Sequence, residues 1–235
     1  MGTSIVDPIS LSEQFLSSIA ANQSTSSILE NYRQMDAEYL RDQLDTEEKK
    51  LVFWINTYNG FIQDFLFNDP SLYGDRGAFF SKKRMVIAGK EMSFDDLEHG
   101  IIRSSRWKLS LGYIRNPFAA KHIRMWRTKA PDGRVHFALN CGATSCPPVR
   151  IYHIGRLDKQ MDESARIYLE RTTRIEGNSV TVTPLMSWFR GDFGGKKGVI
   201  KDFLVPYGII PEGLDASLSY GDYDWNLELS EILPE

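Results

Sequence analysis

A run of apolar residues from 51 to 67 constrains the fold more than any other part of this 235-residue chain. Acidic residues precede the run, and Asp45 with Glu48 has the spacing of a capping pair for a helix that begins nearby. Large apolar side chains fall on nearly every side of this helix, so it has no polar face to present to water. We therefore predict a buried central helix that the rest of the chain surrounds.

Three amide side chains interrupt the apolar surface of this helix along one stripe. They are Asn56, Asn59 and Gln63, at spacings i, i+3 and i+7. Buried amides need hydrogen-bond partners. These amides either brace a neighbouring loop, which is the commoner role, or line a pocket.

Short helices and short strands are expected on either side of the central helix. The spacing of apolar residues and turn residues predicts a peripheral helical layer over 9–45, a hairpin over 85–92, a helix over 94–103 capped by Ser93, a helix over 157–171, a hairpin over 173–182, short helices over 185–189 and 199–205, and a final strand over 223–227. Residues 71–84 are expected to be loop, and the basic, aromatic residues 104–133 a long irregular connection.

These elements predict a single α+β domain, with a small, mostly antiparallel sheet packed around the buried central helix. A papain- or transglutaminase-like arrangement is compatible with this pattern, because those folds join a buried helix to a strand-borne histidine. That comparison is an analogy of fold, and fold does not determine function.

Charge and hydropathy narrow the classes of partner. The net charge is −3 and the pI is about 5.9, without the basic balance typical of nucleic-acid binding, so we expect no nucleic-acid partner. No apolar run approaches the ~20 residues that span a bilayer, so we expect no membrane partner. The first residues lack a basic region followed by an apolar core. We expect a cytoplasmic protein, while a secreted or periplasmic location stays open if a signal was removed.

The stretch 135–148 concentrates the reactive residues of the chain, including both of its cysteines. Its alternation predicts a strand with His136 and Asn140 on one face and Cys141 at the end. Along such a strand His136 and Cys141 would be roughly 16 Å apart, too far to share a hydrogen bond. The small residues 142–145 can fold back and return Cys146 beside the strand, where Pro147 favours an extended exit.

Two cysteines do not make a disulfide framework, so we expect free thiols, metal ligands or catalytic groups. A nucleophilic cysteine needs a base within reach and a group that orients the base. The candidate catalytic residues are Cys146, Cys141, His136, His99, Glu98 and Asn140, with Asn56, Asn59 and Gln63 as candidate pocket-lining residues. The Cys-x4-Cys spacing is a weak zinc signature, so we predict no metal site and no cofactor.

Three blocks, residues 53–59, 97–103 and 136–148, resemble the family of unknown function DUF547, and Tyr223-Asp224-Trp225 resembles its closing block. The resemblance covers about residues 45–228. It implies a DUF547-like domain there, preceded by a helical layer of the same globule over 1–44 and followed by a tail over 229–235. It also implies that the family's characteristic polar positions are Asn56, Asn59, Glu98, His99, His136, Asn140, Cys141 and Cys146. The family supplies no established activity.

Three functions stay open. The first is a thiol-dependent hydrolase or acyl transferase that acts on an amide or ester. The second is a non-catalytic module that binds a peptide or small ligand and uses the His, Asn and Cys residues as a structural network. The third and weakest is a zinc site formed by Cys141, Cys146 and one or two histidines.

Overall fold

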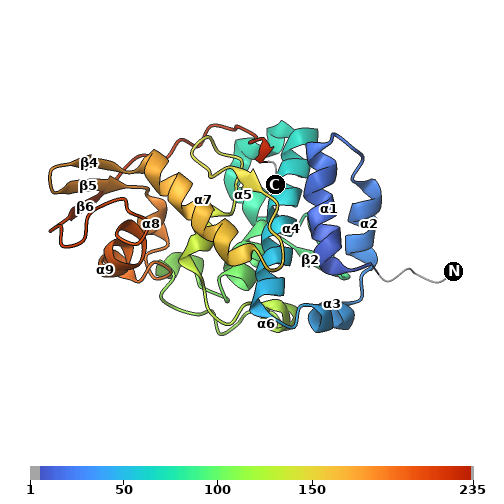
Figure 1. Ribbon diagram of the computed structural model, residues 1–235. Helices are drawn as coiled ribbons and strands as arrows, with labels where there is room; N and C mark the ends of the chain where they lie inside the picture. The colour runs from blue at the N-terminus through green and yellow to red at the C-terminus, as the bar shows by residue number, and fades with distance from the viewer. Residues whose placement is uncertain (1–5, 234–235) are drawn as a thin grey trace.

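A computed structural model describes residues 6–233, and the predicted central helix lies in its core. This helix, α4 (Glu47–Asn68), is buried over most of its length, as predicted. Helices α1 (Pro8–Ala20) and α2 (Ser26–Gln34) cover one side of it, and α7 (Leu157–Thr172) lies on the other side in the view of Figure 1. The cap of α4 is Thr46, whose hydroxyl accepts from the Lys49 backbone N–H, and not Asp45. The α+β class is confirmed.

The closest helix contact in the core depends on Gly60 of α4. A Cβ atom at this position would collide with the ring of Phe15 on α1. Phe15 packs in turn on Tyr32 of α2 and on Phe61, with ring centroids 5.7 and 5.2 Å apart. The peripheral helical layer predicted over 9–45 therefore packs on α4 through aromatic rings. Helix α3 (Ala37–Gln43) completes this layer.

The strands are short and form three small sheets within residues 6–233. They are β1 (Met85–Ile87) with β2 (Lys90–Met92), β3 (Val149–Arg150) with β7 (Ile232–Leu233), and β4 (Arg174–Glu176) with β5 (Ser179–Val182) and β6 (Ser217–Tyr220). The β1–β2 and β4–β5 pairings are antiparallel, whereas β3–β7 and β5–β6 are parallel. Figure 1 places the three-stranded sheet at the far end of the molecule from α2.

The remaining helices are short. They are η1 (Pro70–Asp75), α5 (Arg76–Ser81), η2 (Asp96–Ile102), η3 (Lys108–Ser110), α6 (Lys121–Trp126), η4 (Gly133–Phe137), α8 (Leu185–Trp188), α9 (Gly195–Gly198) and η5 (Val199–Leu204). Ser93 and Asp96 cap η2 reciprocally through backbone and side chain, as predicted. No helix within residues 6–233 is long and apolar enough to cross a membrane.

Two expected loops contain helices that the sequence reading missed. Residues 71–84 form η1 and α5, each started by an aspartate side chain, Asp69 or Asp75, that accepts a backbone N–H. Residues 104–133 contain η3 and α6. Gly74 and Gly77 suggested a loop in the sequence. Gly74 nevertheless lies within η1 and Gly77 within α5, because each of these short helices has an aspartate cap at its N-terminus.

Two predicted strands are wrong. Residues 223–227 lie alongside the loop at 143–145 and form only an isolated bridge between Ala143 and Leu227. Residues 133–137 form the 3-10 helix η4 in place of a strand, because the Asp132 carboxylate accepts the Arg134 backbone N–H and starts a tight turn. The chain from His136 to Cys141 is therefore not extended, and the separation of roughly 16 Å expected along a strand does not apply to these two residues.

Candidate functional site

A cavity of about 280 Å³ lies between the loop that carries the cysteines, η2 and the segment around α8. Four of the predicted catalytic residues line it: Cys141, His136, His99 and Glu98. Tyr58 reaches it from α4, and Trp188, Phe189, Tyr223 and Trp225 give it an aromatic wall. Residues from distant parts of the chain thus meet around one space large enough for a small substrate group.

The two thiols form a pair at one side of this cavity. Cys141 Sγ and Cys146 Sγ are 2.7 Å apart, closer than unbonded heavy atoms normally pack and longer than the roughly 2.04 Å of a disulfide. The loop between them folds back as its small residues allow, with the Cys146 N–H donating to the Ala143 carbonyl at 2.9 Å. Cys141 is partly exposed and lines the cavity, whereas Cys146 is 3 % exposed behind it.

Hydrogen bonds converge on the Cys146 sulfur. The backbone N–H of Cys141 donates to it at 3.1 Å, and the Tyr223 hydroxyl lies 3.2 Å away. Burial raises the pKa of Cys146, but the donors at Cys141 and Tyr223 outweigh it and bring the pKa to about 7. The same hydrogen bond with Cys146, followed by burial, raises the pKa of Cys141 well above its usual value. Cys146 is therefore the thiol of the pair that loses its proton first, near neutral pH.

His136 faces the cavity from η4 in a fixed orientation. Its Nε2 lies 2.9 Å from Asp192 Oδ2, and its ring stacks on Phe189 with centroids 3.9 Å apart. Asp192 accepts a hydrogen bond from the protonated Nε2. The other ring nitrogen, Nδ1, is then unprotonated and carries the free lone pair. Burial lowers the pKa of His136 more than Asp192 raises it, so the imidazole is neutral and can accept a proton.

Arg103 links the two histidines. Its Nε donates to Asp192 Oδ2 at 2.5 Å, and its Nη1 lies 2.7 Å from Nδ1 of His99. The Arg103 and Asp192 side chains are 1 % and 0 % exposed, so this is a buried ion pair. Burial, followed by the charge of Arg103, lowers the pKa of His99 to about 3, so His99 is neutral. Burial raises the pKa of Glu98, although Arg103 and His136 oppose it.

The amides of the predicted site brace the backbone. Asn59 donates to the Ala138 carbonyl and accepts from the Asn140 N–H, both at 2.9 Å. Asn56 holds the backbone of Tyr152 in the same two-sided way, at 2.8 and 2.9 Å. Asn140 donates to the Pro147 carbonyl at 2.7 Å and accepts from the Gly142 N–H at 2.8 Å, so it closes the base of the cysteine loop.

These amides are not among the described residues that line the cavity, and neither are Gln63 and Cys146. Gln63 is buried on α4, and its side-chain nitrogen has no partner within residues 6–233. The structure thus brings Cys141, His136, His99 and Glu98 to one cavity, and it places the remaining predicted residues in the support behind them.

Neither thiol makes a hydrogen bond to a histidine within the described part of the chain; the sulfurs bond to each other, to Tyr223 and to backbone. A substrate that reacts with both Cys141 and His136 would therefore have to bind in the cavity that both residues line. No group of three or more His, Cys, Asp or Glu residues within residues 6–233 is arranged to hold a metal ion.

Sequence reasoning missed Asp192, Arg103, Tyr58 and Tyr223 as site residues. Asp192 lies in a glycine-rich corner, 56 positions after His136, and nothing near it in the sequence predicts its role. Arg103 and Tyr58 lie inside blocks that carry the family resemblance, and Tyr223 opens its closing block, so position within the blocks was the available signal.

Comparison with known proteins agrees with the resemblance seen in the sequence. The model of the family described as "Protein of unknown function, DUF547" matches residues 42–169, which is more than half of the chain. No curated protein and no solved structure matches. The matched range contains both cysteines, His99, His136 and Arg103, whereas Asp192 and Tyr223 lie beyond it. The chain therefore belongs to the DUF547 family.

Proposed function

We propose that the protein is a thiol-dependent hydrolase or acyl transferase that acts on an amide or ester. The observation that carries the proposal is the shared cavity: a thiol with an acceptor for its proton on one side, and on the other a neutral histidine oriented by a buried carboxylate. Nucleophile, base and orienting group are the three parts that acyl transfer by a thiol requires.

Cys141 is the attacking group, because it lines the cavity and Cys146 lies behind it. Its proton passes to the Cys146 thiolate while its sulfur bonds to the carbonyl carbon of the substrate. The carbonyl oxygen takes the negative charge, and collapse of this intermediate expels the amine or alcohol, which takes up the proton now held by Cys146. His136 Nδ1 then accepts a proton from the water that attacks the thioester; the acid is released, and the departing Cys141 thiolate takes that proton back from His136.

The proposal is tested with p-nitrophenyl acetate as an acyl donor and mass spectrometry of the peptides. We expect an acetyl group on Cys141 that forms faster than on the denatured chain and disappears in Cys141→Ala. In His136→Gln we expect acetyl-Cys141 to accumulate, because attack by water is slowed more than acylation.

A Cys141 that is acetylated no faster than in the denatured chain would contradict the proposal. Such a result, together with a ligand that still binds the Cys141→Ala variant, would support the non-catalytic binding module. Acetylation that is equally fast in Cys141→Ala would place the reactive group elsewhere.

A second candidate is dithiol–disulfide exchange, which the 2.7 Å separation of the sulfurs favours. Cys141 would attack a substrate disulfide and release one thiol, and Cys146 would then displace the other and form a Cys141–Cys146 disulfide. This chemistry has no need of a histidine held by Asp192, so it explains less of the cavity. Equilibration with reduced and oxidised glutathione measures it: an intramolecular disulfide with a potential of about −180 to −270 mV would support exchange.

A further inference from the structure

Residues 104–131 carry a concentrated positive charge in an acidic protein. The segment has seven lysines and arginines and no acidic residue: Arg106, Lys108, Arg115, Lys121, Arg124, Arg127 and Lys129. Because the whole chain has a net charge of −3, the residues outside this segment carry −10. Within residues 6–233, only Lys108 of these seven forms an ion pair, with Asp95 at 3.0 Å.

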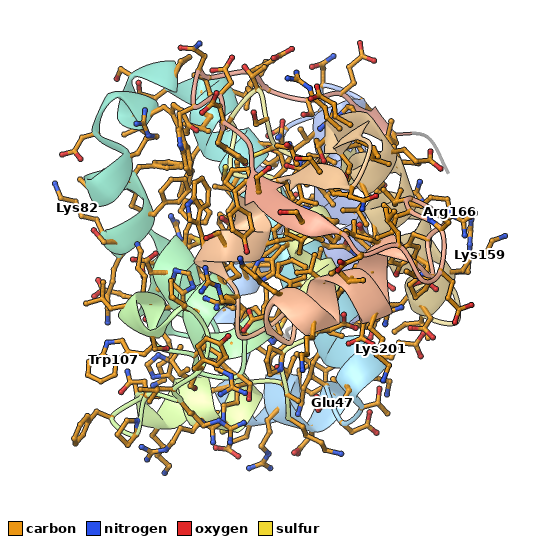
Figure 2. All side chains as sticks on the ribbon, turned by 90° about the vertical axis from the view of Figure 1, so that its left-hand side faces the viewer. Glu47, Lys82, Trp107, Lys159, Arg166 and Lys201 are labelled. Atoms are coloured by element: carbon orange, nitrogen blue, oxygen red, sulfur yellow. The ribbon has the colours of Figure 1, made fainter. Side chains whose placement is uncertain are left out.

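The same segment exposes most of the large apolar side chains found at the surface. Eleven such residues are exposed within residues 6–233, and six of them lie in the twelve positions from 107 to 118. They are Trp107, Leu109, Leu111, Tyr113, Ile114 and Phe118. Leu109 is 88 % exposed and Phe118 is 86 % exposed, and Figure 2 shows Trp107 pointing away from the ribbon at the edge of the molecule. A cluster of this kind marks an interaction site more often than a chance arrangement.

Backbone hydrogen bonds hold these side chains in place. The Trp107 N–H donates to the Ile114 carbonyl at 2.8 Å, and the Asn116 N–H donates to the Ser105 carbonyl at 2.7 Å, so residues 105–116 form a closed loop. The Gly191 N–H donates to the Leu111 carbonyl at 2.7 Å and ties the turn of this loop to the chain beside Asp192. We call residues 105–118 the basic apolar loop.

We propose that the basic apolar loop docks the protein on an anionic phospholipid surface. Exposed aromatic and aliphatic side chains on such a loop enter the region between headgroups and acyl chains, while the surrounding lysines and arginines attract acidic headgroups. A lipid surface fits better than a symmetric dimer formed through this loop, because two copies would bring the same cations together. The sequence predicted no membrane partner because no segment spans a bilayer, but docking of this kind uses a loop at one leaflet and needs no spanning helix.

Docking would bring the candidate site close to the lipid surface. Lys108 belongs to the loop and also lines the cavity, and the loop is bonded at Leu111 to the segment that carries Asp192. The proposal does not depend on acyl transfer, because it concerns a surface outside the cavity.

The test is sedimentation of the whole chain with vesicles of phosphatidylcholine containing about one-third phosphatidylserine, against vesicles of phosphatidylcholine alone. We expect binding to the acidic vesicles at low salt, weakened as salt is added. The double variant Leu109→Ser, Phe118→Ser is expected to bind at least about tenfold more weakly, and Lys121→Glu roughly tenfold more weakly. These three side chains are exposed, so circular dichroism should show an unchanged fold.

Matched controls lie on other parts of the surface. Phe67 is 67 % exposed at the end of α4, and Lys159 lies at the opposite edge of the molecule from Trp107 in Figure 2. Phe67→Ser and Lys159→Glu should leave vesicle binding unchanged. The proposal is overturned if the wild-type chain does not sediment with acidic vesicles at low salt. It is also overturned if the two control substitutions weaken binding as much as the double variant and Lys121→Glu do. Two other outcomes would overturn it too, if the protein does not bind vesicles. One is binding to an oligonucleotide, and the other is self-association seen by light scattering, each lost in the double variant.

Discussion

Replacing Tyr223 with phenylalanine removes one hydroxyl from the thiol pair and leaves the ring in place. That hydroxyl lies 3.2 Å from Sγ of Cys146, the thiol of the pair whose pKa is lowered. A hydrogen bond to a charged group contributes about 1.5–3 kcal/mol, and one pKa unit corresponds to about 1.4 kcal/mol. The pKa of Cys146, about 7 in the wild-type chain, should therefore rise in Tyr223→Phe. The expected new value is roughly 8–9.

The assay is the rate of alkylation by iodoacetamide as a function of pH, with the modified peptides identified by mass spectrometry. Only the thiolate reacts, so the midpoint of the rate profile reports the apparent pKa of the pair. Tyr220→Phe is the matched control, because the Tyr220 hydroxyl is buried and has no partner within residues 6–233. An unchanged midpoint in Tyr223→Phe, or an equal change in Tyr220→Phe, would refute the assignment of Tyr223 as a donor to the thiolate.

Three further predictions concern the support behind the cavity. Asn59→Ala should lower the free energy of unfolding by about 2–6 kcal/mol, because it leaves two buried backbone groups without a hydrogen-bond partner. The control Asn68→Ala, at an exposed amide of the same helix, should change the free energy of unfolding little. Equal denaturation midpoints for the two variants would contradict the bracing role of Asn59. Asp192→Asn should lower the free energy of unfolding by about 3–5 kcal/mol, because it breaks a buried ion pair with Arg103. A decrease of less than about 1 kcal/mol, measured by urea unfolding, would argue against that pair. Because burial lowers the pKa of both His99 and His136, the unfolded chain binds more protons below pH ~6.5, so stability should fall as the pH drops below that value. His136→Gln should make that dependence on pH shallower, and an unchanged slope in urea titrations from pH 7 to 5 would contradict it.

The central helix and its helical layer could be predicted because their signals are local. Apolar residues on all sides of residues 51–67 leave burial as the only stable arrangement, and the acidic residues before them mark the start. The hairpins at 85–92 and 173–182 follow in the same way from turn residues between short apolar runs. The reciprocal cap of Ser93 and Asp96 is likewise a three-residue signal.

The site could be predicted only in part, because its geometry depends on contacts between distant segments. Alternation over 135–140 is compatible with a strand, yet the Asp132 turn starts a 3-10 helix and Asn59 then fixes the backbone at Ala138 and Asn140. The orienting carboxylate of His136 comes from Asp192, in a glycine-rich segment 56 positions further along the chain. The donor to Cys146 comes from Tyr223, near the end of the chain. No local pattern encodes either contact.

The proposed mechanism requires Cys141 and Cys146 to act as one acid–base unit. Thiolate absorbance near 240 nm, measured from pH 5 to 10 against a Cys141→Ala, Cys146→Ala double variant, tests it. We predict two separate steps in the native protein, one proton released near pH 7 and the second only well above pH 9, which merge near pH ~8.5 on unfolding. Two thiols that titrate together near pH ~8.5 in the native protein would contradict the shared proton and the mechanism built on it.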